Sequence, residues 1–417
     1  MSLTNKDRTI LRDCAKRIAE IAALPVHREK AELWRKLNDL EPVRPMVWLD
    51  EHPWHELNVN DELTLRCEDT WARTMETAFR RLLYNWKHLR ADMIVSGYLP
   101  SPIVVRGEDF GIDEQVEILR TDAASDVVSR RFIPQIVEPA DVEKIRMPEL
   151  TVDEAATAAE YERRAELSSD ILPVKKVGMK HHWFTPWDNL IRFWGVEQAM
   201  MDLILRPNMV NAAISRWVDA SLKLVEQWET LNVLTLNNDN TRIGSGAYGY
   251  TKDLPGVPFD PNRVRAKNLW GCSNAQVFSE VSPEMHWEFA LRHEMRFLER
   301  WGLAYYGCCE PLDRKMDLLR RIPNLRKVSM SPKADPARGA EALGRDYVYS
   351  MKPNPAILAE DVWRLDRARA DLRDALEKTR GCNVEIIMKD ISTIRYEPQR
   401  LWEWTRMASE TAEEFAP

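Results

Sequence analysis

The stretch KVSMSPKADPARGAEALGRDYVYS, residues 327–350, contains one complete structural unit of this chain. It begins with a short apolar run, residues 327–330, and ends with another, residues 347–349. A polar, proline-containing segment with a helical pattern lies between the two runs. Two short strands joined through a helix are typical of a parallel sheet, because parallel neighbours need a long crossover connection.

The same alternation continues through much of the chain. Further short apolar runs lie at residues 93–95, 103–105, 176–179, 233–236, 303–306 and 384–388. Helical patterns fill the gaps, at residues 187–205, 208–231 and 282–299, the last opening with a serine cap followed by proline. This order predicts an α/β fold, a (β/α)8 TIM barrel, because closure into a barrel is a common solution at this length.

The N-terminal part has a different pattern. Residues 1–90 are mostly helical, with a first strand near residues 46–49, and we expect them to form an N-terminal helical extension. Residues 91–417 are then expected to form the barrel, packed as one unit with the extension.

Composition narrows the class of protein. The 417 residues are 44% hydrophobic and 30% charged, which favours a large folded core over disorder. A net charge of −7 argues against nucleic acid or an anionic membrane as the main partner. No apolar run is long enough to span a membrane, no apolar signal stretch opens the sequence, and the six scattered cysteines do not suggest disulfides. We therefore expect a cytoplasmic protein.

In a barrel of this kind, catalytic groups lie at the C-terminal ends of the strands. The most distinctive such end is Gly307-Cys308-Cys309-Glu310. Alternate residues of an extended segment share a face, so Cys308 and Glu310 are expected to face one site and Cys309 to point elsewhere. A thiolate and a carboxylate together suit Zn²⁺. The alternative is that both cysteines are small buried apolar residues.

Titratable and aromatic residues follow other predicted strands. The candidate acid–base residues are His181, His182, Glu51 and Asp390, although Lys389 and Asp390 also suit an ion pair that orders their loop. The candidate substrate-binding residues are His52, Trp183, Asn237, Trp270 and Gln276. The alternative for the histidines is an ordinary loop position, and for most tryptophans it is helix–barrel packing.

Residues 244–249, GSGAYG, formally match the GxGxxG dinucleotide pattern. A dinucleotide site needs these glycines to open a helix directly after a strand, and here prolines follow instead. We expect a mobile loop over the mouth of the barrel.

Several segments together resemble the uroporphyrinogen decarboxylase-like superfamily: LNVLTLN, WGCSNAQVFSEVSPEMHWEF, YYGCCEPLDRK, VSMSPKADPARGAEALGRDY and VEIIMKDISTIRYEPQRLWEW. The resemblance preserves their order over residues 40–410. It implies a (β/α)8 barrel with an N-terminal helical extension. The superfamily includes tetrapyrrole decarboxylases and zinc-dependent, corrinoid-linked methyltransferases.

The chain departs from the patterns of both groups, and its departure from the decarboxylase pattern favours the corrinoid-linked methyltransferases. The segment LDEHPW, residues 49–54, is acidic where the decarboxylases carry arginines for their polycarboxylate substrate. The methyltransferases carry His-x-Cys, which Tyr306-Gly307-Cys308 matches only at the cysteine. They carry another cysteine after the last strand, where this chain has Asp390 and Ser392, so either the zinc ligands differ, with Cys308 and Glu310 at their centre, or the metal is absent.

The resemblance implies a methyltransferase that moves a methyl group between a small substrate, such as an aromatic methyl ether, and a separate corrinoid protein carrying cobalamin. Zn²⁺ on Cys308 and Glu310 would act as the Lewis acid, and His181 or His182 would protonate the leaving oxygen. The chain has no Asp-x-His-x-x-Gly corrinoid motif of its own. One alternative is a metal-free decarboxylase or lyase using His52, His181 and Asp390. Another alternative is a non-catalytic barrel that binds a ligand or a corrinoid. The sequence also leaves open whether the protein forms a homodimer.

Overall fold

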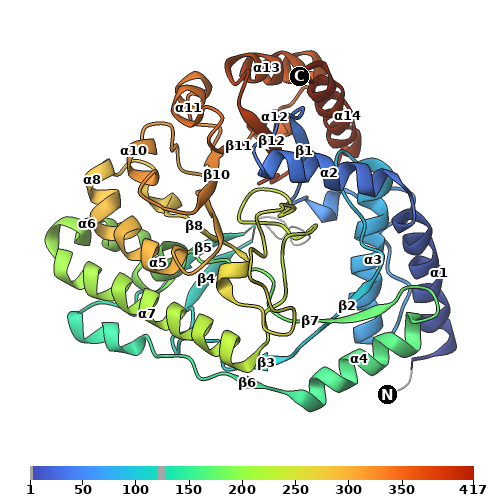
Figure 1. The fold of residues 1–417 in the computed structure, drawn as a ribbon, viewed down its shortest axis with the longest axis horizontal. Helices are drawn as coiled ribbons and strands as arrows, with labels where there is room; N and C mark the ends of the chain where they lie inside the picture. Colours follow the sequence, from blue (N-terminus) through green and yellow to red (C-terminus); the bar gives the residue numbers. More distant parts are fainter. Residues whose placement is uncertain (1–2, 121–127) are drawn as a thin grey trace.

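The computed structural model describes residues 3–120 and 128–417 (Figure 1). Its centre is a six-stranded parallel sheet with the strand order β1-β12-β11-β10-β9-β8. The strands are β1 (Met46–Leu49), β8 (Trp270–Ser273), β9 (Leu303–Tyr306), β10 (Leu325–Met330), β11 (Val348–Met351) and β12 (Asn383–Met388). The first strand pairs with the last, Met46 lying opposite Glu385, so the N-terminal region supplies an edge of the sheet.

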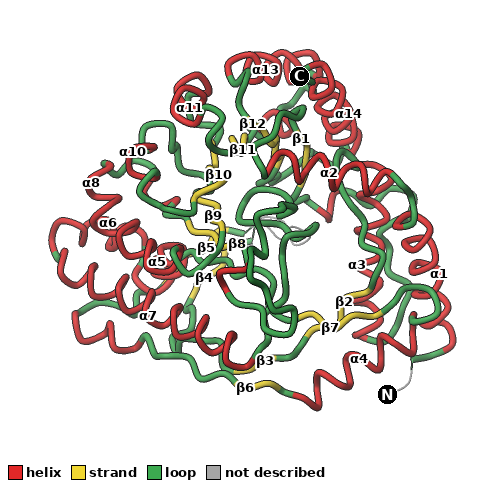
Figure 2. Tube along the Cα trace, in the orientation of Figure 1, coloured by secondary structure: helices red, strands yellow, loops and turns green. Residues whose placement is uncertain are grey.

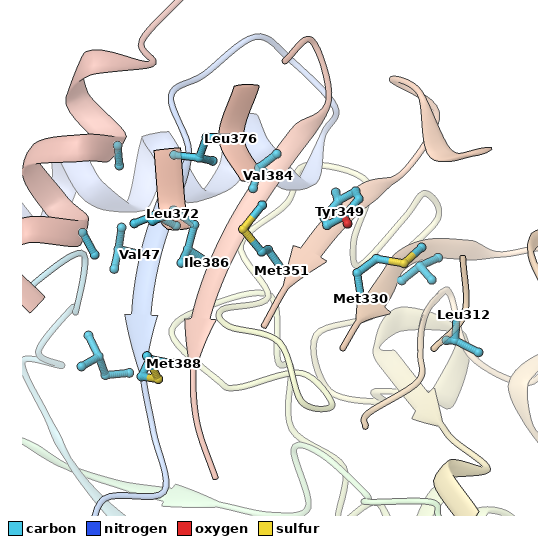
Figure 3. Packing of buried hydrophobic residues seen from close by; sticks show 14 of the residues in the cluster. Val47, Leu312, Met330, Tyr349, Met351, Leu372, Leu376, Val384, Ile386 and Met388 are labelled. Carbon is cyan, nitrogen blue, oxygen red and sulfur yellow. The ribbon is translucent and has the colours of Figure 1, made fainter. Parts of the chain in front are cut away.

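Helices cover the outside of the C-terminal half of this sheet (Figure 1). They are α10 (Met316–Leu319), α11 (Pro336–Leu343), α12 (Ala356–Ala359), α13 (Leu365–Lys378) and α14 (Pro398–Glu414). Figure 3 shows the apolar layer between them and the strands, in which Met351, Val384 and Ile386 approach Leu372 and Leu376 of α13. Local sequence signals set the helix starts, as at α11, where the Asp335 side chain accepts hydrogen bonds from two main-chain amides.

A second apolar layer lies under α5 (Pro186–Trp194), α6 (Val196–Leu205) and α7 (Pro207–Leu231). It includes the segment made of α8 (Pro283–His286), the π-helical turn η5 (Trp287–Leu291) and α9 (Arg292–Leu298). The expected single helix over residues 187–205 is divided at Gly195, whose φ of 81° does not continue a helix.

The remaining helices and strands surround these two layers. The helices are α1 (Asn5–Ala22), α2 (Val26–Asn38), α3 (Thr70–His88) and α4 (Glu154–Ser168), with short 3₁₀ turns η1 (Trp54–Glu56), η2 (Pro139–Lys144), η3 (Ala266–Asn268) and η4 (Gln276–Phe278). Three two-stranded sheets pair β2 (Leu99–Pro102) with β7 (Val174–Val177), β3 (Val105–Arg106) with β6 (Thr151–Val152), and β4 (Val116–Leu119) with β5 (Ser129–Phe132).

The described ladder does not close between β8 and β1. Of the apolar runs expected there, residues 93–95 form no strand, and residues 233–236 contribute one parallel bridge, from Leu234 to Met179. Conversely, Trp270–Ser273 forms strand β8, although it is not among the apolar runs that predict strands. Its Trp-Gly-Cys-Ser composition lacks the apolar run that marks other strands.

Residues 243–249, here called the interior loop, are all buried, so the expectation of a mobile loop over the mouth is wrong. Figure 2 shows loop segments, in green, running through the middle of the molecule beside the strands of the sheet. The Lys327 ammonium donates to the Tyr248 carbonyl at 3.1 Å, and the Trp270 indole donates to the Gly249 carbonyl at 2.8 Å. The glycines allow this, because a Cβ on Gly246 would lie 2.5 Å from a Glu385 oxygen.

In the described part of the chain, no helix combines the length and the apolar character needed to cross a membrane.

We expect Gly246→Ala to lower the free energy of unfolding by about 1–3 kcal/mol, because the new methyl group must displace the Glu385 carboxylate or the Tyr305 ring. Urea denaturation measures the change. Gly97→Ala is the matched control, since a Cβ there meets no atom within 4 Å. Equal stability of the two variants would show that the interior loop is not tightly packed.

Candidate functional site

Charged and thiol side chains converge where β1, β9 and β12 end. The Lys389 ammonium, just after β12, lies 3.2 Å from Glu51 Oε2 and 2.6 Å from Asp390 Oδ2. The same ammonium lies 3.8 Å from Cys308 Sγ, just after β9. In the sheet order three strands separate β9 from β1, so these contacts show that the strand ends curve toward one another.

Arg242 adds a second cation from the segment that leads into the interior loop. Its guanidinium pairs with Asp50 and lies 3.1 Å from Glu51 Oε1. Burial acts to raise the pKa of Glu51, but hydrogen bonding with Asp390 and the charges of Lys389 and Arg242 lower it to about 2. Glu51 is therefore an anion at neutral pH and is unsuited to be a proton donor.

The two adjacent cysteines lie on the same side of the chain. Their sulfurs are 3.6 Å apart, and Cys309 Sγ lies 3.6 Å from Asp390 Oδ2. The expectation that Cys309 points away from Cys308 is wrong because residues 308–310 form a bend and do not extend β9. The bend follows Gly307, which has a φ of 101° and lacks the Cβ that would lie 2.4 Å from Leu312.

Cys308 is buried and Cys309 is exposed. The hydrogen bond with Cys309 lowers the pKa of the Cys308 thiol, and the Lys389 charge lowers it further, against the effect of burial. The pKa of Cys309 is raised in the same interaction. Cys308 is thus the more acidic of the two thiols.

Glu310 braces this bend. Its two carboxylate oxygens accept hydrogen bonds from the main-chain amides of Cys308, at 2.8 Å, and Ala275, at 3.2 Å. The side chain is fully buried, and burial raises its pKa. Glu310 therefore supports the position of Cys308. Its carboxylate is not free to act as a second metal ligand beside the thiol.

Within residues 3–120 and 128–417, no group of three or more His, Cys, Asp or Glu side chains is arranged to hold a metal ion.

The two predicted histidines have different surroundings. His181 Nε2 accepts the Gly244 amide at 3.0 Å and lies 3.5 Å from Cys272 Sγ, and burial lowers its pKa to about 3. Its Nδ1 is buried with no hydrogen-bond partner in the described structure. His182 packs 5.2 Å from the Trp228 ring and close to Phe297, so the structure does not bring it to the thiols.

The predicted substrate-binding residues do not gather in one place. Trp270 is buried and holds the interior loop, and Asn237 joins strand segments through hydrogen bonds to the Lys180 and Trp270 carbonyls. Gln276 donates to Asp188 at 2.7 Å. The residues with accessible or unsatisfied groups are Trp183, which is 40% exposed, and His52, whose buried Nδ1 has no partner in the described residues.

Sequence reasoning missed several groups of the site. Arg242, Cys272 and Lys352 were not singled out, and Lys389 was favoured only as a loop-ordering partner of Asp390. One signal was present: Lys327, Lys352 and Glu385 are charged residues within or directly after apolar strands. Lys352 is buried, donates to Tyr305 and Ser350 at 2.8 and 2.6 Å, and has a pKa lowered by burial to about 7.

We expect Lys389→Met to raise the pKa of the Cys308 thiol, because the variant removes the nearby positive charge. Alkylation of Cys308, followed by mass spectrometry of its peptide, should then require a higher pH. Lys333→Met, which changes an exposed lysine, should leave the alkylation profile unchanged. Identical profiles in the wild type and Lys389→Met would contradict thiolate stabilisation by Lys389.

We expect Glu310→Gln to lower the free energy of unfolding by about 1–3 kcal/mol, because its NH₂ group faces a main-chain amide that needs an acceptor. Chemical denaturation tests this, with the exposed Glu341→Gln as control. An unchanged midpoint for Glu310→Gln would mean that the carboxylate does not brace the bend.

No family model matches the chain, and no curated protein matches it. Among solved structures, the fold is similar to that of a methyltransferase from Methanosarcina mazei, with a TM-score of 0.51 and 11% sequence identity. The match covers 93% of this chain and 99% of that chain. At this identity the likeness shows a shared fold, a mixed α/β architecture around a parallel sheet.

Proposed function

We propose that this protein is a methyltransferase that moves a methyl group between a small substrate, such as an aromatic methyl ether, and cobalamin carried by a separate corrinoid protein. The observation that carries the proposal is the contact of the Lys389 ammonium with Cys308, Glu51 and Asp390 at the carboxyl edge of the sheet. The shared fold with a methyltransferase supports it at the level of architecture. Function must still rest on the site, since one fold hosts many chemistries.

The proposal includes a (β/α)8 barrel around this site. Two contacts support strand positions in the gap between β8 and β1. The Asp92 amide donates to the Val47 carbonyl of β1 at 3.1 Å, and Met179 bridges in parallel to Leu234. Six strands are already paired, so two more strands, drawn from residues 93–95, 176–179 and 233–236, would complete a wall of eight.

The expected zinc pair fits poorly. A Zn²⁺ ion held jointly by Cys308 and Glu310 needs a free carboxylate oxygen beside the thiolate, and both Glu310 oxygens already accept main-chain amides. No step is therefore assigned to zinc.

The chain's own side chains supply charge and a proton. Loss of a methyl group from an ether leaves negative charge on the ether oxygen. The Lys389 ammonium would stabilise that charge, and the Cys308 thiolate and Glu51 carboxylate raise the pKa of Lys389, so it stays protonated. Asp390, whose pKa is raised by burial, would protonate the oxygen. Cys308 is then a positioning residue that holds Lys389.

We expect Cys308→Ala to reduce methyl transfer from an aryl methyl ether to added cob(I)alamin by about 100-fold or more, because only Glu51 and Asp390 then position the Lys389 ammonium. The absorbance spectrum of the cobalamin follows the reaction. The loss should appear in kcat, with an unchanged thermal unfolding midpoint. Cys382→Ala, at a half-buried cysteine whose sulfur contacts the Ala340 carbonyl, is the control and should stay active.

Full activity of Cys308→Ala would remove the cysteine from the mechanism. Release of CO₂ from a small carboxylic acid without any corrinoid would instead identify the decarboxylase alternative.

A further inference from the structure

Cys308 and Cys309 form a vicinal pair of thiols that methyl transfer as proposed does not explain. The proposed chemistry uses the Cys308 anion alone, yet the exposed Cys309 sulfur lies 3.6 Å from it. The bend that places both sulfurs together is held by Gly307 and by the Glu310 brace. The bend therefore keeps the two cysteines on the same side of the chain.

The separation of the sulfurs suits a single bridging atom. An atom bonded to two sulfurs at ~2.3 Å holds them ~3.3 Å apart at a right angle and ~3.8 Å apart at a tetrahedral angle. The observed 3.6 Å lies between these limits. Both sulfurs could bind one atom with little movement of the chain.

The charged side chains around the two sulfurs determine which kind of bridging atom the site favours. The Lys389 ammonium, 3.8 Å from Cys308 Sγ, favours the nucleophilic thiolate. The same ammonium already contacts Glu51 and Asp390, so these carboxylates are not free to hold a metal cation beside the thiols. Cys309 Sγ lies 3.6 Å from Asp390 Oδ2. These neighbours favour a neutral, soft electrophile over a divalent ion.

We propose that Cys308 and Cys309 together are a dithiol site that captures a neutral trivalent arsenical, R–As=O. The Cys308 sulfur forms the first As–S bond and the Cys309 sulfur forms the second. The arsenic–oxygen bonds break, and the oxygen leaves as water. One of its protons comes from Cys309, and the other comes from Cys308 or, when Cys308 is already a thiolate, from solvent. Arsenic stays trivalent, so no oxidant or reductant is needed. The proposal does not rest on the methyltransferase assignment, because capture is measured as binding.

The test uses phenylarsine oxide and the intact protein, with mass spectrometry under non-denaturing conditions. We expect one adduct per chain, at the mass of the reagent minus one water. A large excess of a monothiol should not remove it, whereas a 1,2-dithiol should, because only a dithiol can replace both sulfurs at once.

Cys309→Ser changes an exposed residue, so its fold should be preserved, and its adduct should be removed by the monothiol. Cys308→Ala should behave in the same way. Two controls should keep the resistant adduct: Cys382→Ala, and Cys67→Ala, which removes a buried cysteine packed with α1 and α3.

The proposal would be overturned if the monothiol removed the adduct from Cys67→Ala but not from Cys309→Ser. It would also be overturned if the monothiol removed the adduct from the wild-type protein. Methyl transfer by Cys309→Ser is a separate readout, so failure of capture and failure of the proposed activity can be told apart.

Discussion

The buried pair of Lys327 and Glu385 is the interaction on which the arrangement of this protein depends. Both side chains are fully buried, with the ammonium 3.0 Å from Glu385 Oε2. The other oxygen accepts the Ser350 hydroxyl at 2.6 Å. A buried ion pair is tolerated only when its hydrogen bonds are satisfied, because each charge loses its hydration. Here the satisfied network joins β10, β11 and β12 at the centre of the sheet.

The same network fixes the interior loop. Lys327 donates to the Tyr248 carbonyl, and the Ala247 amide approaches Glu385 at 3.4 Å. The interior loop therefore occupies the space beside the strands, and the reactive side chains lie at the ends of the strands. It also aligns site residues: Arg242 leads into the loop and pairs with Glu51, and the Gly244 amide donates to His181. A loop that appears in the sequence as a separate motif thus helps to assemble the site.

Two backbone features decide the character of the thiol pair. Gly307 permits the turn after β9, and the Glu310 carboxylate accepts the Cys308 amide of that turn from within the core. Because the turn interrupts the alternation of an extended strand, Cys308 and Cys309 face the same region. Glu310 therefore holds the bend that carries the two cysteines. Lys389 lowers the pKa of the Cys308 thiol, since its ammonium stabilises the thiolate.

The sequence by itself determined the alternation of strands and helices, the long helix near residues 208–231, and the concentration of reactive residue types at strand ends. These features depend on local periodicity and capping, which neighbouring residues encode. The division of the helix at Gly195, strand β8 and the burial of the interior loop were not predicted. Only the tertiary structure decided which reactive groups meet, because Cys308 and Lys389 are 81 residues apart and touch only through the curvature of the sheet. Likewise, the side of the chain that Cys309 faces depends on a bend stabilised by a buried carboxylate and by the Ala275 amide from a distant segment.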